Sequence, residues 1–196
     1  MYDVVGDVHG QARELETLLA KLGYECEDGC YSHQNRKVIF LGDFIDRGLQ
    51  QREVINIVRP MIDTGTAYTV MGNHEFNAIA YYTPNGRGSY LRQRNSKNTL
   101  QHQAFLNTYQ DDPDGWKDVI DWFKTFPLWL DFHDIRVIHV QCSELQIHHT
   151  SSRRKVRESF GRCSWREGVC LNLYARWVNA ISDTRSTMST RNSTKR

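Results

Sequence analysis

The sequence predicts an α/β fold built on a parallel sheet. Three short apolar runs, each typical of a buried strand, alternate with two segments whose apolar residues recur every three or four positions, as on one face of a helix. Each apolar run ends in a polar turn that contains glycine. Strands and helices in this order favour βαβ units, in which consecutive strands lie parallel.

The elements of the first part of the chain follow from this spacing. The expected strands cover residues 2–6, 37–41 and 67–71, and the expected helices cover residues 11–22 and 51–63. Gly23 and Gly65 are placed to end the two helices. Between the first helix and the second strand, Asp28-Gly29 is a turn signal for a small hairpin.

The second part of the chain is less regular. A long polar loop is expected over 83–103, a helix over 114–126, two joined strands over 128–132 and 135–140, and a short helix over 171–181. The last stretch, 182–196, is nearly all Ser, Thr, Arg, Asn and Lys and is expected to be disordered. The domain boundaries predicted from this pattern are 1–140, 141–181 and 182–196.

Composition narrows the class of protein. A chain of 196 residues can bury one real core but not two comfortable ones. A formal charge of +2 is too mild for a nucleic-acid signature. Five cysteines without zinc-ligand spacing favour free thiols in a reducing compartment. Without a signal peptide or a membrane-length apolar run, the sequence favours a cytoplasmic protein.

Polar side chains follow all three strands of the predicted sheet. The carboxyl ends of parallel strands meet at one edge, so these groups are expected to gather there. They are Asp7 and His9 after the first strand, Asp43, Asp46 and Arg47 after the second, and Asn73 and His74 after the third. A later strand adds His139.

Carboxylates beside imidazoles suit Mn, Fe or Zn better than Ca or Mg. Asp7 and His9 can chelate one ion from a single turn, and Asn73 and His139 could hold a second. Asp43 could bridge the two. A two-metal site of this kind clamps the attacking and leaving oxygens of a displacement at phosphorus.

The remaining polar groups suit acid catalysis and phosphate binding. His74 directly follows a predicted ligand, so it can act as general acid, with Asp46 holding its other ring nitrogen. Arg47 has the forked donors that grip a phosphate oxygen. Taken alone, residues 42–48 fit a polar turn with an Asp–Arg ion pair equally well.

Three motifs now stand in order: Gly6-Asp7-Val8-His9-Gly10, Gly42-Asp43-Phe44-Ile45-Asp46-Arg47-Gly48 and Gly72-Asn73-His74-Glu75. With them, roughly residues 1–140 resemble the calcineurin-like metallophosphoesterases, in the branch of Ser/Thr protein phosphatases and bacterial diadenosine tetraphosphatases. The resemblance implies a four-layer α/β/β/α sandwich and phosphate-ester hydrolysis by a hydroxide that bridges two metal ions.

The resemblance also implies roles for single residues. Asp7, His9 and Asp43 would bind the first ion, and Asp43, Asn73 and His139 the second. His74 with Asp46 would be the acid pair, while Arg47 and Asn73 would contact the substrate phosphate. The implied cofactors are two divalent transition-metal ions (Mn, Fe or Zn).

The chain departs from the family after His139. The family continues with a small or glycine-rich turn and a later Gly-His pair that completes the second metal site, and neither stands here. His148 and His149 come too soon and are expected to be exposed. We therefore expect an incomplete C-terminal sheet, and an atypical, truncated or frame-shifted end. A nucleic-acid-binding arm is not favoured, because few aromatic residues are interleaved.

Other polar and aromatic residues receive plainer interpretations. His33, His102 and His133 are expected on the surface, and Trp116, Trp122 and Trp129 in the core. Arg87, Arg92 and Arg94 belong to the long loop, where solvent is the expected surrounding and a second phosphate the alternative.

The predicted function is metal-dependent hydrolysis of a phosphomonoester or phosphoanhydride. The expected substrates are a phosphorylated small molecule, a nucleotide such as a dinucleoside polyphosphate, or a phosphoprotein. Neither a membrane nor a nucleic acid is expected as partner. The alternative is a catalytically impaired relative that binds metal or phosphate without turnover, as the missing histidine motif suggests.

Overall fold

The computed structural model of the chain describes residues 1–132 and 134–139, and every structural statement below refers to them. They belong to the first of the two units into which the chain divides, Met1–Val140. The predictions made for residues beyond 140, and for His133, lie outside the described residues.

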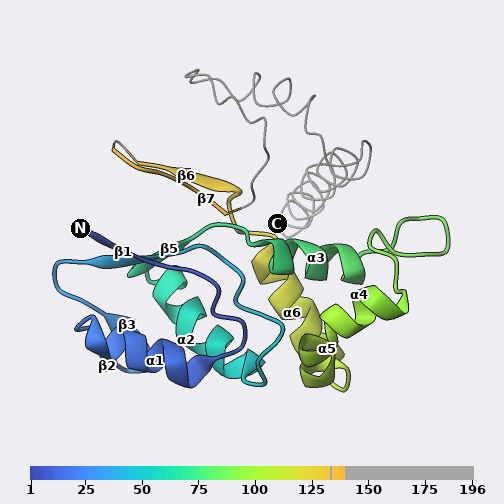
Figure 1. The fold of residues 1–196 in the computed structure, drawn as a ribbon, viewed down its shortest axis with the longest axis horizontal. Helices are drawn as coiled ribbons and strands as arrows, with labels where there is room; N and C mark the ends of the chain where they lie inside the picture. Colours follow the sequence, from blue (N-terminus) through green and yellow to red (C-terminus); the bar gives the residue numbers. More distant parts are fainter. Residues whose placement is uncertain (133, 140–196) are drawn as a thin grey trace, which may run out of the picture. The chain divides into compact units, whose positions relative to one another are not determined.

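Three parallel strands of this unit form one sheet (Figure 1). Its strands are β1 (Tyr2–Val5), β4 (Lys37–Phe40) and β5 (Ala67–Thr69), in the order β1-β4-β5. Val5 pairs with Phe40, and Phe40 with Thr69, so the three carboxyl ends lie level. The predicted parallel α/β arrangement is confirmed.

Two amphipathic helices, α1 (Ala12–Lys21) and α2 (Gln51–Asp63), cover one face of the sheet (Figure 1). They bury most of the apolar residues that predicted them, among which Leu19, Val54 and Val58 are fully buried, whereas Leu18 is exposed. The bounds of α2 are those expected, and α1 begins and ends one residue inside its predicted range.

Two hairpins flank the sheet. In the first, β2 (Glu25–Glu27) and β3 (Cys30–Ser32) pair antiparallel. Both residues of the turn, Asp28 (φ 49°) and Gly29 (φ 80°), are left-handed, as a two-residue hairpin turn of the primed type requires. The predicted hairpin is confirmed.

The second hairpin forms another strand layer. It consists of β6 (Trp129–Asp131) and β7 (Arg136–Ile138), paired antiparallel on the face of the sheet opposite α1 and α2 (Figure 1). Val137 packs with Ile39 and Val70 in one apolar cluster. Helices, parallel sheet and second strand layer therefore follow one another as in the expected sandwich, with two strands of the second sheet inside the described residues.

Within the described residues, four helices follow β5, and of these only the last was predicted. They are α3 (Asn73–Tyr82), α4 (Ser96–Gln101), α5 (Gln103–Tyr109) and α6 (Pro113–Phe123). The expected loop over 83–103 is wrong at its end, where α4 and the start of α5 lie. Polar α4 shows no apolar period; it begins because the Asn95 side chain accepts a hydrogen bond from the Asn98 N–H (2.9 Å).

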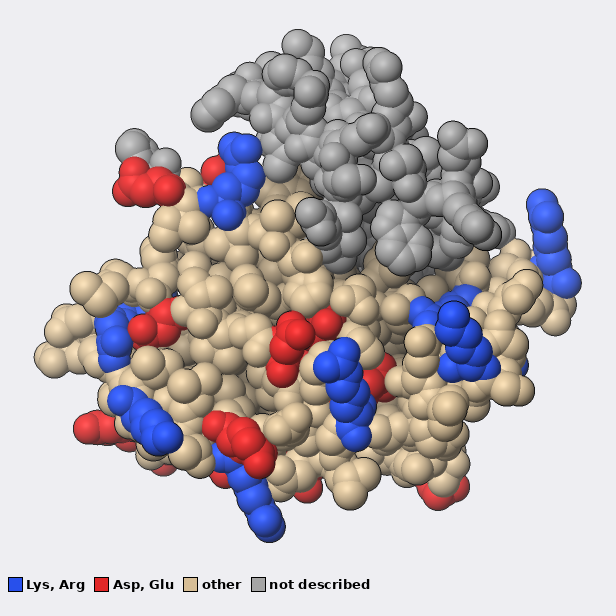
Figure 2. Space-filling view, in the orientation of Figure 1, with Lys and Arg blue, Asp and Glu red and all other residues tan. Residues whose placement is uncertain are grey.

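The surface and the cysteines agree with the composition. On the described part of the face in Figure 2, Lys and Arg side chains are scattered among Asp and Glu and form no single basic patch. Cys26 and Cys30 are free thiols, as expected. Of the three tryptophans expected in the core, Trp122 is buried, whereas Trp116 and Trp129 are half-buried. Among the described helices, none has the length and apolar character needed to cross a bilayer.

Candidate functional site

The turns after β1 and β4 lie side by side at the carboxyl end of the sheet. The His9 N–H donates to the Asp43 carbonyl (2.9 Å), and the Gly10 N–H donates to the Phe44 carbonyl (2.8 Å). The Gly48 N–H returns a bond to the His9 carbonyl (2.9 Å). This backbone ladder fixes the first two polar clusters relative to one another.

The same turns hold side chains in left-handed backbone. Six described residues other than glycine have a positive φ, and five of them belong to these two turns. They are Asp7 (50°), His9 (46°), Asp43 (54°), Asp46 (70°) and Arg47 (63°). Left-handed backbone is unfavourable for most L-residues and is concentrated at functional sites. The strained backbone of these two turns therefore indicates a functional site.

The third turn approaches the second so closely that only glycine fits. A Cβ at Gly72 would collide with the Asp43 backbone nitrogen, the Asp43 carboxylate and the Glu75 carboxylate. A Cβ at Gly42 would collide with the Gly72 backbone. The two glycines therefore allow the ends of β4 and β5 to bring their side chains together.

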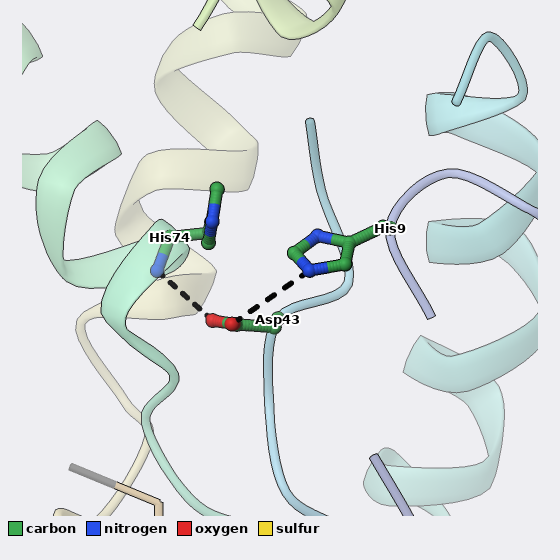
Figure 3. Close-up of side chains that lie close together, drawn as sticks. All are labelled: His9, Asp43 and His74. Carbon is green, nitrogen blue, oxygen red and sulfur yellow. Dashed lines mark hydrogen bonds and ion pairs between the residues drawn. The ribbon is translucent and has the colours of Figure 1, made fainter. Parts of the chain in front are cut away.

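His9 offers a buried nitrogen without a partner. Its Nδ1–H donates to the Ile45 carbonyl (2.9 Å), which leaves a lone pair on Nε2. That Nε2 lies 4.0 Å from an Asp7 carboxylate oxygen and 3.9 Å from Asp43 Oδ2 (Figure 3), and it has no hydrogen-bond partner among the described residues. A buried imidazole nitrogen left free beside two carboxylates fits a metal ligand.

Asp43 lies between two imidazoles. His139 Nε2 is 3.3 Å from Asp43 Oδ2, on which His9 also converges, and 3.1 Å from Asn73 Oδ1. Two groups of potential ligands have donor atoms within 4.8 Å of one another: His9, Asp43 and His74, and Asp7, Asp43 and His139. Asp43 belongs to both, which is the position expected of a bridging ligand.

These groupings differ from the predicted ones. His74, predicted as the acid, takes the place of Asp7 beside His9 and Asp43, and Asp7 is grouped with Asp43 and His139. All five predicted ligands nevertheless lie around one point, and their carboxylate, amide and imidazole donors fit divalent transition-metal ions.

His74 and Asp46 form the hydrogen-bonded pair that the sequence suggested. His74 Nδ1 lies 2.7 Å from Asp46 Oδ2, which leaves His74 Nε2 available to a substrate. The His74 backbone N–H donates to Asp43 Oδ1 (3.0 Å), as Figure 3 shows. The candidate acid is therefore tied to the candidate bridging ligand as well as to Asp46.

Neighbouring charges favour an ion pair here. Burial works against the Asp46 carboxylate, but hydrogen bonds from His102 and His74 outweigh it and lower the pKa of Asp46. Burial likewise opposes a charged His74, but its hydrogen bond to Asp46 and the Asp43 charge raise the pKa of His74. A protonated His74 is the form that can donate a proton.

The expectation of a surface position for His102 is wrong. This residue is 4% exposed, and its Nδ1 lies 2.8 Å from Asp46 Oδ1. No pattern in the sequence indicated this contact, because it joins positions 56 residues apart through helices that were not predicted.

Glu75 is a second residue whose contribution to the site was not predicted, although it stands at the end of the third motif. Its fully buried carboxylate accepts hydrogen bonds from the backbone N–H groups of Asp43 and Phe44, both at 2.8 Å. Burial and the nearby Asp43 charge raise the pKa of Glu75 to about 7. The only signal for it was its place at the end of the third motif.

A cavity of about 460 Å³ opens beside the acid pair. Its lining includes Arg47, Asn73 and His74 from the motifs, together with Arg92, Leu100 and Gln103 from later in the chain. Arg94 instead lies over the rings of Tyr81 and Tyr90, and Arg87 is exposed outside the cavity. Of the three loop arginines, Arg92 is thus the one in the cavity lining.

The fold and the site together define the class of protein. It is an α/β protein with a candidate metal centre at the carboxyl ends of its parallel strands, beside a hydrogen-bonded His–Asp pair. The model of the calcineurin-like phosphoesterase family matches residues 2–167. The chain therefore belongs to that family, and the family expected from the three motifs is confirmed.

Two curated relatives have the same printed name, bis(5'-nucleosyl)-tetraphosphatase PrpE (asymmetrical). The protein of Oceanobacillus iheyensis is 32% identical over 137 residues, or 69% of this chain and 53% of the relative. That of Halalkalibacterium halodurans is 47% identical over 74 residues, or 37% of this chain and 30% of the relative. The matched part of the chain thus spans about half the length of the first relative and about a third of the length of the second.

A solved structure supports the fold alone. A point mutant of a cold-active protein tyrosine phosphatase superposes with a TM-score of 0.51 at 23% sequence identity. The match covers 74% of this chain and 43% of the other.

Proposed function

We propose that this chain hydrolyses a phosphomonoester or a phosphoanhydride with the help of two divalent metal ions. The observation that carries the proposal is the Asp43 carboxylate between the Nε2 atoms of His9 and His139, next to the hydrogen-bonded His74–Asp46 pair. A metal centre and a proton donor side by side are the two parts such a hydrolysis needs.

The position of each residue indicates its role in the proposed reaction. Asp7, His9, Asp43, Asn73 and His139 would hold the ions. Manganese, iron or zinc would suit these donors, and when bound would supply a Lewis acid and an activated water. His74 would donate the proton on Nε2 to the leaving oxygen, with Asp46 holding its ring. Arg47 and Asn73 would contact the phosphoryl group at the edge of the cavity.

The cavity indicates where the leaving group lies. Because His74 lines it and would protonate the leaving oxygen, the rest of the leaving group would extend toward Arg92. A guanidinium there favours an anionic leaving group, such as the second phosphate of a nucleotide or dinucleoside polyphosphate. The names of the relatives support this choice over a phosphoprotein. Free Cys26 and Cys30 support a cytoplasmic setting.

Turnover of p-nitrophenyl phosphate with added manganese tests the proposal. We expect activity that disappears in Asp43→Asn, since an amide is a weaker ligand than a carboxylate. Asp118→Asn is the matched control, because Asp118 is exposed and pairs with Arg59 outside the site. Calorimetric titration with manganese separates the alternative: a protein that binds the ion without turnover would be an impaired relative.

A further inference from the structure

His102 is tied to the candidate acid pair, although it lies in none of the three motifs. It stands at the junction of α4 and α5, and its Nδ1 approaches Asp46 Oδ1 at 2.8 Å. Asp46 Oδ2 is the oxygen that holds His74. Each carboxylate oxygen of Asp46 is therefore hydrogen-bonded to one imidazole.

Asp46 has little freedom left. It is 3% exposed, and its backbone N–H donates to Gln51 Oε1 (2.8 Å). With a hydrogen bond on each oxygen, its carboxylate cannot turn without breaking one of them. The plane of this carboxylate sets the direction in which the His74 ring points, because His74 is bound through Nδ1.

The ring of His102 is itself held by aromatic neighbours. It stacks on Phe105, with centroids 4.8 Å apart and planes 18° apart, and lies 5.4 Å from the Tyr81 ring. Its Nε2 is buried without a hydrogen-bond partner among the described residues, so its polar contact runs through Nδ1. A hydrogen on Nδ1 fits this contact, since the Asp46 carboxylate can only accept.

We propose that His102 is a positioning residue: its Nδ1–H fixes the Asp46 carboxylate, and Asp46 in turn aims the Nε2–H of His74 at the leaving oxygen. This inference rests on the proposed function for the role of His74. The substrate would touch His74, whereas His102 would act through Asp46.

Leaving-group dependence separates positioning from a merely structural role. An aryl phosphate with a poor leaving group, phenyl phosphate, needs its leaving oxygen protonated more than p-nitrophenyl phosphate does. In His102→Phe, which keeps a ring but removes the donor, we expect kcat for phenyl phosphate to fall about tenfold or more. The fall for p-nitrophenyl phosphate should be clearly smaller, and KM for both should stay near the wild-type value.

His102→Asn provides the rescue, because its side-chain N–H can take the place of Nδ1–H and should restore much of the phenyl phosphate activity. His33→Phe is the control, since His33 lies away from the site beside Arg36 and Tyr24. Equal losses on both substrates, no loss at all, or an Asn variant as impaired as the Phe variant would overturn the proposal.

A spectroscopic measurement covers the remaining outcomes. If the wild type turns over neither substrate, the proposed function fails, but the hydrogen bond can still be judged. In protein labelled with ¹⁵N-histidine, His102→Leu, which removes the donor and keeps an apolar side chain, should move the ring N–H resonance of His74, because both rings contact Asp46. A His74 resonance that stays in place would overturn the inference, also in the case where His102→Phe does not fold.

Discussion

The carboxylate of Glu75 holds the backbone of Asp43 from another element. Glu75 lies in the first turn of α3, Asp43 follows β4, and Oε2 of the first accepts the N–H of the second at 2.8 Å. The other oxygen accepts the N–H of Phe44. The central carboxylate of the site therefore owes its position to a second, buried carboxylate.

Replacing Glu75 with Gln should destabilise the protein by about 1–3 kcal/mol, because one backbone N–H would then face an amide NH₂ instead of an acceptor. Urea unfolding measures the effect. Glu14→Gln is the control: Glu14 is exposed in the first turn of α1, where the change should stay within about 0.5 kcal/mol. Equal free energies of unfolding for the two variants would contradict the inference that Glu75 holds the backbone of Asp43 in place.

Glu75 should also make the metal-free protein sensitive to pH. Its pKa is raised from 4.5 to about 7, so between these values the unfolded chain releases a proton that the folded chain retains. The free energy of unfolding should therefore fall as pH rises through this window. Unfolding in the presence of a chelator should show this fall in the wild type and a weaker one in Glu75→Gln. Parallel curves would refute the assignment.

Gly72→Ala should lower stability by about 1–3 kcal/mol, because the new methyl group overlaps Asp43 and Glu75. Backbone conformation is not the obstacle, since Gly72 has φ −81° and ψ 163°. Gly6→Ala is the matched control, because its nearest neighbour is Leu41 Cδ1 at 3.4 Å, an ordinary contact. Thermal unfolding of both variants measures the difference. An unchanged melting temperature in Gly72→Ala would show that the two turns can move apart to accommodate the methyl group.

Arg92→Met should change substrate preference. Loss of a charge-assisted contact of about 1.5 kcal/mol should lower kcat/KM for a dinucleoside tetraphosphate about tenfold and leave p-nitrophenyl phosphate nearly unaffected. Arg87→Met makes the same chemical change at an exposed position of the same loop. If both variants behave alike, the leaving group does not extend toward Arg92.

The regular part of the fold was readable from the sequence, because local periods encode it. The apolar stripe of α2 gave its bounds, and the strands of the parallel sheet were found to within two residues. Short strand ends are set by ladder hydrogen bonds, which an apolar run does not report. The polar turns also indicated which side chains would meet, since strand ends in a parallel sheet share an edge.

What the sequence did not reveal depends on partners distant along the chain. His102 stands in a polar stretch without a clear period, and nothing nearby shows that its ring is buried against Phe105 and Tyr81. Glu75 was visible within a motif, but its bonds to the backbone of Asp43 and Phe44 involve groups that every residue possesses. Contacts of this kind leave no mark on composition or spacing.

The middle position of β4 has a consequence for local opening of the molecule. Both edges of this strand are hydrogen-bonded, to β1 and to β5, whereas each of these neighbours pairs with β4 alone among the described strands. Amide hydrogens of β4 should accordingly exchange with deuterated water more slowly than those of β1 or β5. Asp43, which follows this strand, is thus anchored to the segment of the sheet least prone to fraying.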